Sequence, residues 1–196
     1  MVRVIAGSAK GRNLLSVPGT GTRPITDRVK ESLFDILGAD VQRSLWLDLY
    51  AGTGSVGIEA LSRGAEHVVF IDKAYPAVAT VRRNLDLTGF ADRSEVVRGD
   101  ALRYIAQARG DRLFDYVYVA PPQYQDLWAE TLARLDERSL LVPDGEIIVQ
   151  IHPRELHPVS LRTLEQADER RYGSTLLIFY RLASSQLEGK DDASSG

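Results

Sequence analysis

The amino-acid sequence predicts an α/β fold built around one mostly parallel sheet. Three observations support this class. Short apolar runs alternate with helical patterns along most of the 196 residues, a glycine-rich loop follows the apolar run at residues 44–50, and the last two apolar runs lie too close together for a helix between them. Alternating strands and helices are typical of parallel sheets with right-handed crossovers. An antiparallel hairpin is expected only at the end of the sheet.

The N-terminal part of the chain predicts a β-hairpin followed by a loop. The hairpin is expected within residues 3–16, because apolar pairs at residues 4–5 and 14–15 flank a turn that contains two glycines. Residues 17–25 hold two prolines and two glycines, which predict an extended loop. The fold class is therefore a parallel sheet domain with an N-terminal β-hairpin extension.

The remaining elements follow from caps and from the period of the apolar residues. Thr26 is a good N-cap for a helix that runs to about Leu37, and Gly38 predicts its end. The expected strands are residues 44–50, 67–72, 94–98, 115–120 and 146–152. The expected helices are residues 54–63, 76–88, 100–109 and 124–136. Residues 161–172 and 174–182 are expected to form the antiparallel hairpin that completes the sheet.

Composition indicates an ordinary globular protein of a reducing compartment. Hydrophobic residues make up 44% and charged residues 26% of the chain, which is typical of a protein with a full core. Without cysteine, the chain excludes disulfides, cysteine nucleophiles and cysteine-based zinc sites. No signal peptide and no apolar run of membrane-spanning length is found in the sequence. We expect a cytoplasmic monomer that binds no metal and no membrane.

Positive charge is concentrated at the start of the chain. Residues 1–30 contain six basic side chains and one acidic side chain, a net charge of +5; because the whole chain carries −3, the remainder carries −8. A basic segment on an acidic body is typical of a surface that contacts phosphate groups. A solvated surface with no partner is the alternative.

A glycine-rich loop after the first predicted strand of the sheet indicates a nucleotide cofactor. Gly52, Gly54 and Gly57 have the G-x-G-x-x-G spacing, and glycines let backbone N–H groups approach a ligand closely. A tight turn with no ligand is the alternative. Asp48 lies four residues before the first glycine. A carboxylate repels a pyrophosphate but accepts hydrogen bonds from an ammonium group, which favours S-adenosylmethionine over NAD.

Two further acidic residues end the next two strands. Asp72 lies 20 residues after Gly52, where a carboxylate can accept hydrogen bonds from both ribose hydroxyls. Its alternatives are a helix cap or a surface charge. Asp100 could accept from the adenine amine, and the N–H of Ala101 could donate to the ring, although Asp100 could also simply cap the following helix.

A Pro-Pro turn follows the fourth strand of the sheet and carries the candidate chemistry. Pro121 and Pro122 lack N–H donors and fix their φ angles, and the proline after Ala120 forces that residue into an extended conformation. The turn is therefore stiff, and its carbonyl oxygens are free of competing donors. Tyr124 offers a flat face on which a base can stack. A purely structural turn is the alternative.

This turn resembles the (Asp/Asn)-Pro-Pro-(Tyr/Phe) motif of amino-group methyltransferases. In that motif a side-chain oxygen and a proline carbonyl hold the amine hydrogens, so that the nitrogen lone pair faces the sulfonium methyl group. The chain departs from the motif in two places, since Ala120 stands at the acidic position and Gln123 precedes the aromatic residue. The carbonyl groups of Ala120 and Pro121 remain as acceptors.

The chain as a whole resembles the RsmD family, bacterial methyltransferases that act on the guanine N2 amine of 16S ribosomal RNA. The matching stretches are Arg3–Gly7, Gly11–Arg12, Arg23–Phe34, Asp48–Gly54, Gly57–Gly64 and Arg171–Gly173. The resemblance implies a Rossmann-like class I methyltransferase sheet, S-adenosylmethionine as cofactor, and 16S rRNA or a small-subunit assembly intermediate as partner. It also implies an RNA-contacting extension at residues 1–25 and a methyltransferase domain at residues 26–182. Residues 183–196 are short of large apolar side chains and rich in serine, glycine and charge, which predicts a disordered tail.

The resemblance also assigns roles to residues. The catalytic residues would be Ala120, Pro121, Pro122 and Tyr124. The cofactor-binding residues would be Pro24, Thr26, Arg28, Asp48, Tyr50, Ala51, Gly52, Thr53, Gly54, Asp72, Lys73, Asp100 and Ala101. The RNA-binding residues would be Arg3, Lys10, Arg12 and Arg23. The target base would leave its stack and enter beside the Pro-Pro turn.

Three other functions stay open from the sequence. The same amine chemistry serves protein glutamine or DNA adenine methyltransferases, and only the basic N-terminal segment favours RNA over those substrates. The glycine loop alone would also fit an NAD-dependent oxidoreductase. Finally, the alanine at position 120 would suit an RNA-binding protein whose catalysis has decayed.

Overall fold

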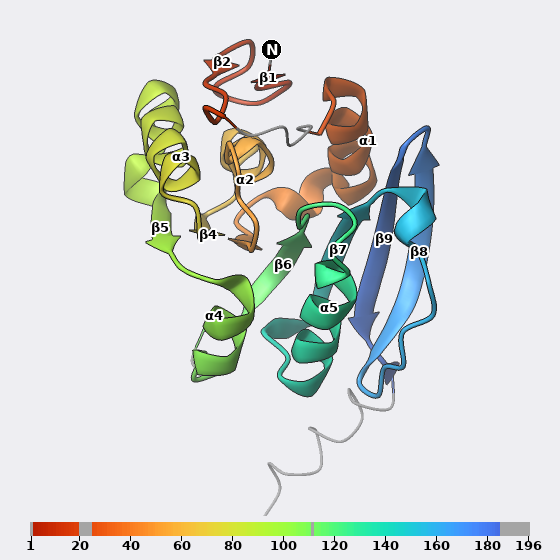
Figure 1. Ribbon diagram of the computed structural model, residues 1–196. Helices are drawn as coiled ribbons and strands as arrows, with labels where there is room; N and C mark the ends of the chain where they lie inside the picture. Colours follow the sequence, from red (N-terminus) through yellow and green to blue (C-terminus); the bar gives the residue numbers. More distant parts are fainter. Residues whose placement is uncertain (1, 20–24, 111, 185–196) are drawn as a thin grey trace, which may run out of the picture.

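The computed structural model describes residues 2–19, 25–110 and 112–184 (Figure 1). Its strands are β1 (Val2–Arg3), β2 (Asn13–Leu14), β3 (Leu45–Asp48), β4 (His67–Asp72), β5 (Ser94–Arg98), β6 (Phe114–Val119), β7 (Leu141–Ile151), β8 (Leu164–Tyr172) and β9 (Thr175–Leu182). Its helices are α1 (Asp27–Leu37), α2 (Ser55–Ser62), α3 (Tyr75–Thr88), α4 (Ala101–Gln107) and α5 (Leu127–Glu137), with 3-10 turns η1 (Gly38–Val41), η2 (Ala91–Arg93) and η3 (Pro153–Glu155). The predicted Arg23 and Pro24 and most of the predicted tail lie outside the described residues.

Seven strands form one sheet in the order β5-β4-β3-β6-β7-β9-β8. The five strands from β5 to β7 are mutually parallel, whereas β9 is antiparallel to both β7 and β8. The order runs outwards from β3 in both directions, so a crevice is expected at the carboxyl ends of β3 and β6. The predicted α/β class, the parallel sheet and its C-terminal antiparallel hairpin are confirmed.

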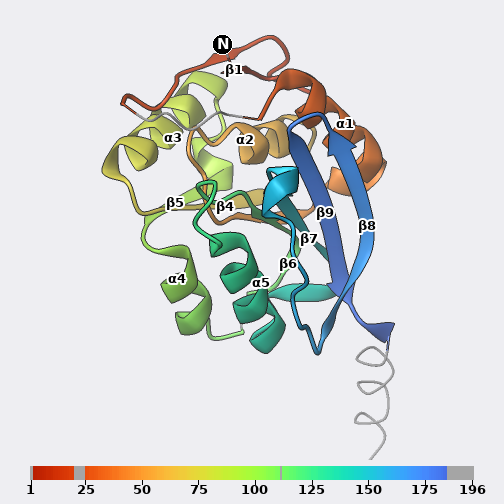
Figure 2. The same ribbon diagram turned by 45° about the vertical axis from the view of Figure 1, so that its right-hand side comes forward.

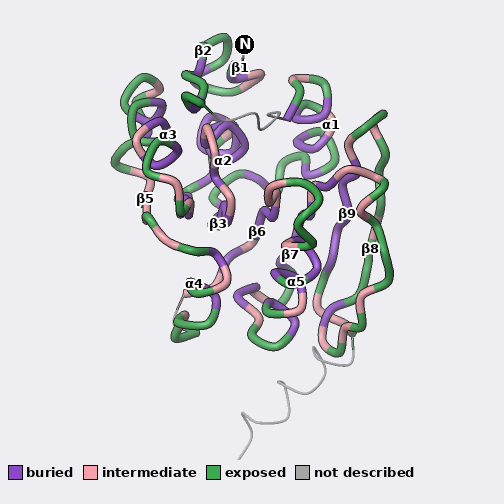
Figure 3. Tube along the Cα trace, in the orientation of Figure 1, coloured by how far each residue is buried: buried purple, intermediate pink, exposed green. Residues whose placement is uncertain are grey.

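The central strands of the sheet are buried on both faces between two layers of helices (Figures 1 and 2), whereas most of the edge strand β8 is exposed. One core joins α1, α2 and α3 to one face through Trp46, Phe70, Tyr118 and Phe179. The other core joins α4 and α5 to the opposite face through Leu47, Ile71, Val117 and Ile178. The central strands are therefore apolar on both sides, and Figure 3 shows them buried while the outer sides of the helices are exposed.

The first helix begins and ends where its capping residues predict. The hydroxyl oxygen of Thr26 accepts from the backbone N–H of Val29 at 3.4 Å, and Gly38 ends the helix with a φ of 56°. Apolar side chains spaced along one side of α1 are buried, including Leu33 and Phe34. The ring of Phe34 stacks on that of Trp46, with centroids 5.5 Å apart, and so fixes α1 on the sheet.

Several predicted boundaries differ from the structure. The N-terminal hairpin exists, but its paired strands are Val2–Arg3 and Asn13–Leu14 rather than residues 4–5 and 14–15, because Val4 and Gly11 begin the turn. Strand β7 begins at Leu141 rather than at residue 146. Pro143 and Gly145 lie within this strand, and its register against β6 shifts between Phe114 and Tyr116.

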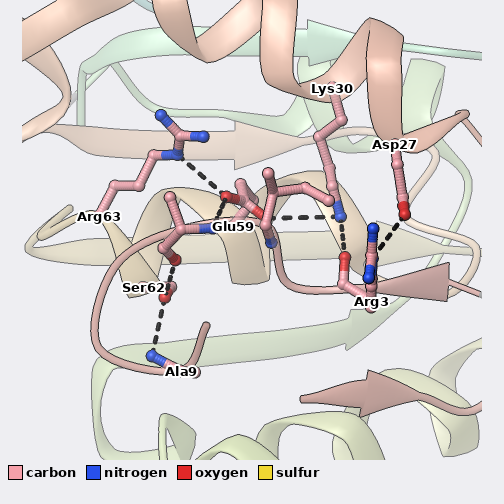
Figure 4. A network of polar contacts seen from close by, with 9 residues as sticks. Arg3, Ala9, Asp27, Lys30, Glu59, Ser62 and Arg63 are labelled. Atoms are coloured by element: carbon pink, nitrogen blue, oxygen red, sulfur yellow. Dashed lines mark hydrogen bonds and ion pairs between the residues drawn. The ribbon is translucent and has the colours of Figure 1, made fainter. Parts of the chain in front are cut away.

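The N-terminal hairpin is attached to α2 through a buried carboxylate (Figure 4). Glu59 is fully buried, and its two oxygens accept from the backbone N–H groups of Ile5 and Ala6 at 2.8 and 2.9 Å. The same carboxylate pairs with Lys30 at 3.4 Å and with Arg63 at 2.9 Å. The hairpin is therefore held on the helix that follows the glycine loop.

Gly57 lets α2 pack closely on β4, and we expect Gly57→Ala to destabilise the protein by roughly 1–3 kcal/mol. A Cβ at this position would lie 2.4 Å from the ring of Phe70, which is itself buried. Gly99→Ala is the matched control, because its Cβ would meet its nearest neighbour at 3.9 Å. Urea denaturation measures both variants, and equal stability of the two would contradict the packing argument.

Candidate active site

The carboxyl ends of the parallel strands bring the predicted acidic residues to one edge of the sheet. Asp48 ends β3 and lies opposite Tyr118 of β6 and Phe70 of β4 in the register. Asp72 ends β4, and Asp100 follows β5. Parallel pairing is what places these residues together, although they are 24 and 28 residues apart in sequence.

Asp48 is a buried carboxylate with one oxygen that lacks a partner among the described residues. Its exposed fraction is 2%, and Oδ1 makes no hydrogen bond there. Burial and the nearby charge of Asp72 raise its pKa to about 7, although backbone N–H groups of Gly57 and Tyr50 act in the opposite direction. Such an oxygen fits a positively charged hydrogen-bond donor from a ligand, because that donor would remove the cost of its isolation.

The glycine loop adopts the conformation that its glycines permit. Gly52 and Gly54 have φ angles of 55° and 75°, which side-chain-bearing residues seldom adopt. The N–H of Gly52 donates to Asp72 Oδ2 at 2.9 Å, and the N–H of Ala74 donates to Asp72 Oδ1 at 2.9 Å. Each carboxylate oxygen keeps a further lone pair, so Asp72 can still accept from the two hydroxyls of a ribose.

The other predicted cofactor residues of the loop region differ in what their side chains can do. The hydroxyl of Tyr50 hydrogen-bonds with that of Thr131 of α5 at 2.6 Å, so the phenol of Tyr50 is held within the protein. Asp100 caps α4 by accepting from the N–H of Arg103 at 3.1 Å, which matches the structural alternative and leaves its second oxygen available. Ala51 and Ala101 are buried beside the loop, whereas Thr53 is half-buried and Lys73 is exposed.

The Pro-Pro turn begins directly after β6, beside the end of β3. The backbone N–H of Leu49 donates to the carbonyl of Tyr118 at 3.0 Å, so Ala120 lies two residues beyond a contact with the strand of Asp48. Ala120, Pro121 and Pro122 are half-buried. Tyr124 is 65% exposed, and its ring centroid is 5.9 Å from that of His152. The turn therefore presents carbonyl oxygens and an accessible aromatic face.

The predicted RNA-binding residues Arg3, Lys10 and Arg12 lie on the hairpin, whereas two predicted cofactor-binding residues, Thr26 and Arg28, lie at the start of α1. Lys10 and Arg12 are exposed and have no ion-pair partner among the described residues. Arg3 instead pairs with Asp27 at 2.8 Å, so part of its charge is neutralised. Arg28 is exposed at the start of α1, and the hydroxyl of Thr26 is used in capping.

Sequence reasoning missed a buried asparagine that connects the hairpin segment to the glycine loop. Asn84 of α3 is fully buried; it accepts from the N–H of Leu15 at 2.7 Å and donates to the carbonyls of Leu15 and Thr53 at 3.1 and 2.9 Å. The only signal in the sequence is a polar residue on the buried side of a helix, which has many explanations. Its partners are 31 and 69 residues away, so no local pattern reveals them.

Fold and site together define a Rossmann-like methyltransferase architecture. The family described as Conserved hypothetical protein 95 matches residues 2–181. YlbH of Bacillus subtilis, provisionally assigned as an rRNA methyltransferase, is 40% identical over 92% of this chain and 98% of its own length. Ribosomal RNA small subunit methyltransferase D of Escherichia coli K12 is 31% identical over 98% of this chain and 94% of its own.

A solved structure of a relative agrees with this assignment. YhhF of Escherichia coli, a provisionally assigned methyltransferase, has a TM-score of 0.81 at 30% identity and covers 93% of this chain and 99% of its own. The chain belongs to the RsmD family, and the resemblance derived from its motifs is confirmed. Within the described residues, no helix has the length and apolar character needed to cross a bilayer.

Proposed function

We propose that this protein transfers a methyl group from S-adenosylmethionine to the exocyclic N2 amine of a guanine in small-subunit ribosomal RNA. Membership of the RsmD family supports the coarser statement, that the chain is an S-adenosylmethionine-dependent methyltransferase of small-subunit rRNA. The observation that best supports the cofactor is that Oδ1 of the buried Asp48, beside the glycine loop, has no hydrogen-bond partner among the residues that the structure describes. The proposal includes action as a metal-independent monomer in the cytoplasm.

The residues at the sheet edge suit the parts of this cofactor. Asp48 would hold the ammonium group, the N–H groups of the glycine loop would hold the carboxylate, and Asp72 would accept from the ribose hydroxyls. Asp100 and the N–H of Ala101 would contact the adenine. S-adenosylmethionine, when bound, supplies an electrophilic methyl group. A second carboxylate near Asp48 disfavours a pyrophosphate at this position, and so disfavours NAD.

The Pro-Pro turn suits a planar amine as acceptor. Carbonyl oxygens of Ala120 and Pro121 would accept the two amine hydrogens, and the base would stack on Tyr124, which is exposed beside the turn. Holding the amine in one orientation lowers the barrier to methyl transfer, and this positioning requires no general base. Because Ala120 has no side-chain oxygen, the backbone of the turn would do this alone.

Nucleoside analysis tests the proposal directly. Unmodified small-subunit rRNA and small subunits are incubated with the protein and S-adenosylmethionine, digested and analysed by mass spectrometry. N2-methylguanosine is the expected product. A methylated adenosine would assign the enzyme to another base, and no methylated nucleoside, with RNA binding intact, would favour a binding protein with decayed catalysis. Isothermal titration calorimetry with NAD and with S-adenosylmethionine tests the oxidoreductase alternative, which predicts tight binding of NAD and no binding of S-adenosylmethionine.

The basic hairpin is expected to contact RNA phosphates. Reversing two charges, with Lys10→Glu and Arg12→Glu, should weaken RNA binding and reduce the slope of log affinity against log salt by roughly 1–2, because each lost phosphate contact removes about 0.7–0.9 from it. The matched control is Arg109→Glu with Arg162→Glu, two exposed residues that precede β6 and β8 at the opposite edge of the sheet. An unchanged salt slope in the hairpin variant would remove the hairpin from the RNA interface.

A further inference from the structure

The loop between β6 and α5 contains two residues in the left-handed conformation. Tyr124 and Asp126 have φ angles of 60° and 55°, and neither is a glycine. This conformation disfavours residues with a Cβ, so it persists where surrounding contacts determine it. The helix α5 starts at Leu127 rather than at the predicted residue 124 for the same reason. The contacts that hold this loop therefore matter for the Pro-Pro turn.

The connection after β7 supplies contacts at both positions. Glu155 Oε1 accepts from the backbone N–H of Tyr124 at 2.7 Å, and Glu155 Oε2 accepts from the N–H of His152 at 3.0 Å. Further along, His157 Nε2 lies 2.6 Å from Asp126 Oδ1, a hydrogen bond that raises the pKa of His157. One carboxylate thus joins the end of β7 to Tyr124, two residues after the Pro-Pro turn.

We propose that Glu155 is a positioning residue for methyl transfer, fixing the backbone of Tyr124 and with it the aromatic face beside the Pro-Pro turn. This inference rests on the proposed function. Pro121 and Pro122 have no N–H groups by which the turn could be anchored, and the N–H of Tyr124 is the donor that Glu155 binds. Because Ala120 offers no side-chain acceptor, orientation of the amine depends on the backbone of the turn and on stacking. Glu155 acts through the ring of Tyr124, which it holds near His152.

Single-turnover methyl transfer tests the role. Glu155→Ala should lower the transfer rate by roughly 10- to 100-fold, because small displacements of reacting groups have effects of that size. Glu155→Gln should retain more of the rate, since its amide oxygen can still accept from Tyr124. Affinity for S-adenosylmethionine and the melting temperature should stay close to wild type in both. Glu165→Gln, at an exposed carboxylate on β8, is the control.

A measurement on the protein alone keeps this inference separable from the proposed function. Protein labelled with ¹⁵N-tyrosine contains eight tyrosines, and Tyr124→Phe identifies the signal of Tyr124. Glu155→Ala removes the carboxylate acceptor, so the backbone amide proton signal of Tyr124 should move upfield. The signals of the other seven tyrosines should stay in place. If the wild type transfers no methyl group, the proposed function fails while this contact is still tested. An unmoved signal, a rate within twofold of wild type, or parallel losses of rate, cofactor affinity and melting temperature would each overturn the positioning role.

Discussion

Asp48→Asn is expected to lose nearly all affinity for S-adenosylmethionine while making the ligand-free protein more stable above pH 7. The carboxylate is buried, one of its oxygens has no partner among the described residues, and Asp72 adds a second negative charge nearby. An uncharged amide avoids the cost of burying a carboxylate, but it cannot neutralise the charge of an ammonium group. We expect affinity to fall by roughly 100-fold or more, the effect of deleting one partner of a buried charge pair. Asp86→Asn, on the exposed side of α3, is the control.

The pH dependence of the wild type follows from the raised pKa of Asp48. The folded protein holds this proton up to a pKa of about 7, whereas the ordinary value is 3.8. Stability of the ligand-free protein should therefore fall as the pH rises between these values, by up to about 4 kcal/mol. Cofactor affinity should rise about 50-fold between pH 5 and 7, because binding requires the ionised carboxylate. Titration calorimetry and thermal unfolding measure both; a pH response retained in Asp48→Asn would contradict the assignment.

Glu59→Ala is expected to destabilise the protein by roughly 3–5 kcal/mol, because it leaves the ammonium of Lys30 buried without its counter-charge. Lys30 is 1% exposed and lies 3.4 Å from the carboxylate, and burial lowers its pKa while Glu59 raises it. The N–H groups of Ile5 and Ala6 would also lose their acceptors. Urea denaturation gives the free energy of unfolding.

Two further variants separate the effect of the buried charge pair from the general effect of removing a carboxylate. Glu66→Ala, at an exposed carboxylate just beyond the helix, should change stability little. Lys30→Met combined with Glu59→Gln should recover part of the loss, since it removes both charges together. Equal stability of the Glu59 and Glu66 variants would show that the buried network does not hold the hairpin.

Local patterns predicted the elements because each depends on residues close in sequence. Thr26 and Gly38 bound α1 as their capping preferences predict, and the acidic residues at strand ends share one edge because parallel pairing brings them there. The predicted start of β7 was wrong, because the strand begins at Leu141 and continues through Pro143 and Gly145 with a shift in register against β6. The roles predicted for individual site residues remain predictions.

Long-range polar contacts were beyond reach of the sequence. Glu59 lies in a fully buried helix, and the backbone groups it accepts from are 53 and 54 residues away. Glu155 meets Tyr124 across 31 residues, through a donor that every residue except proline possesses. Neither partnership leaves a periodic or compositional signal, so only the folded arrangement identifies these carboxylates.

A crystal structure of the protein with S-adenosylmethionine, or with its demethylated product, tests the central claim most directly. The account predicts the ammonium group within about 3.5 Å of Asp48 Oδ1, the usual hydrogen-bond limit, and the ribose hydroxyls on Asp72. It also predicts that the sulfur faces the Pro-Pro turn and Tyr124. A cofactor bound away from Asp48, or one whose sulfur points away from that turn, would contradict it.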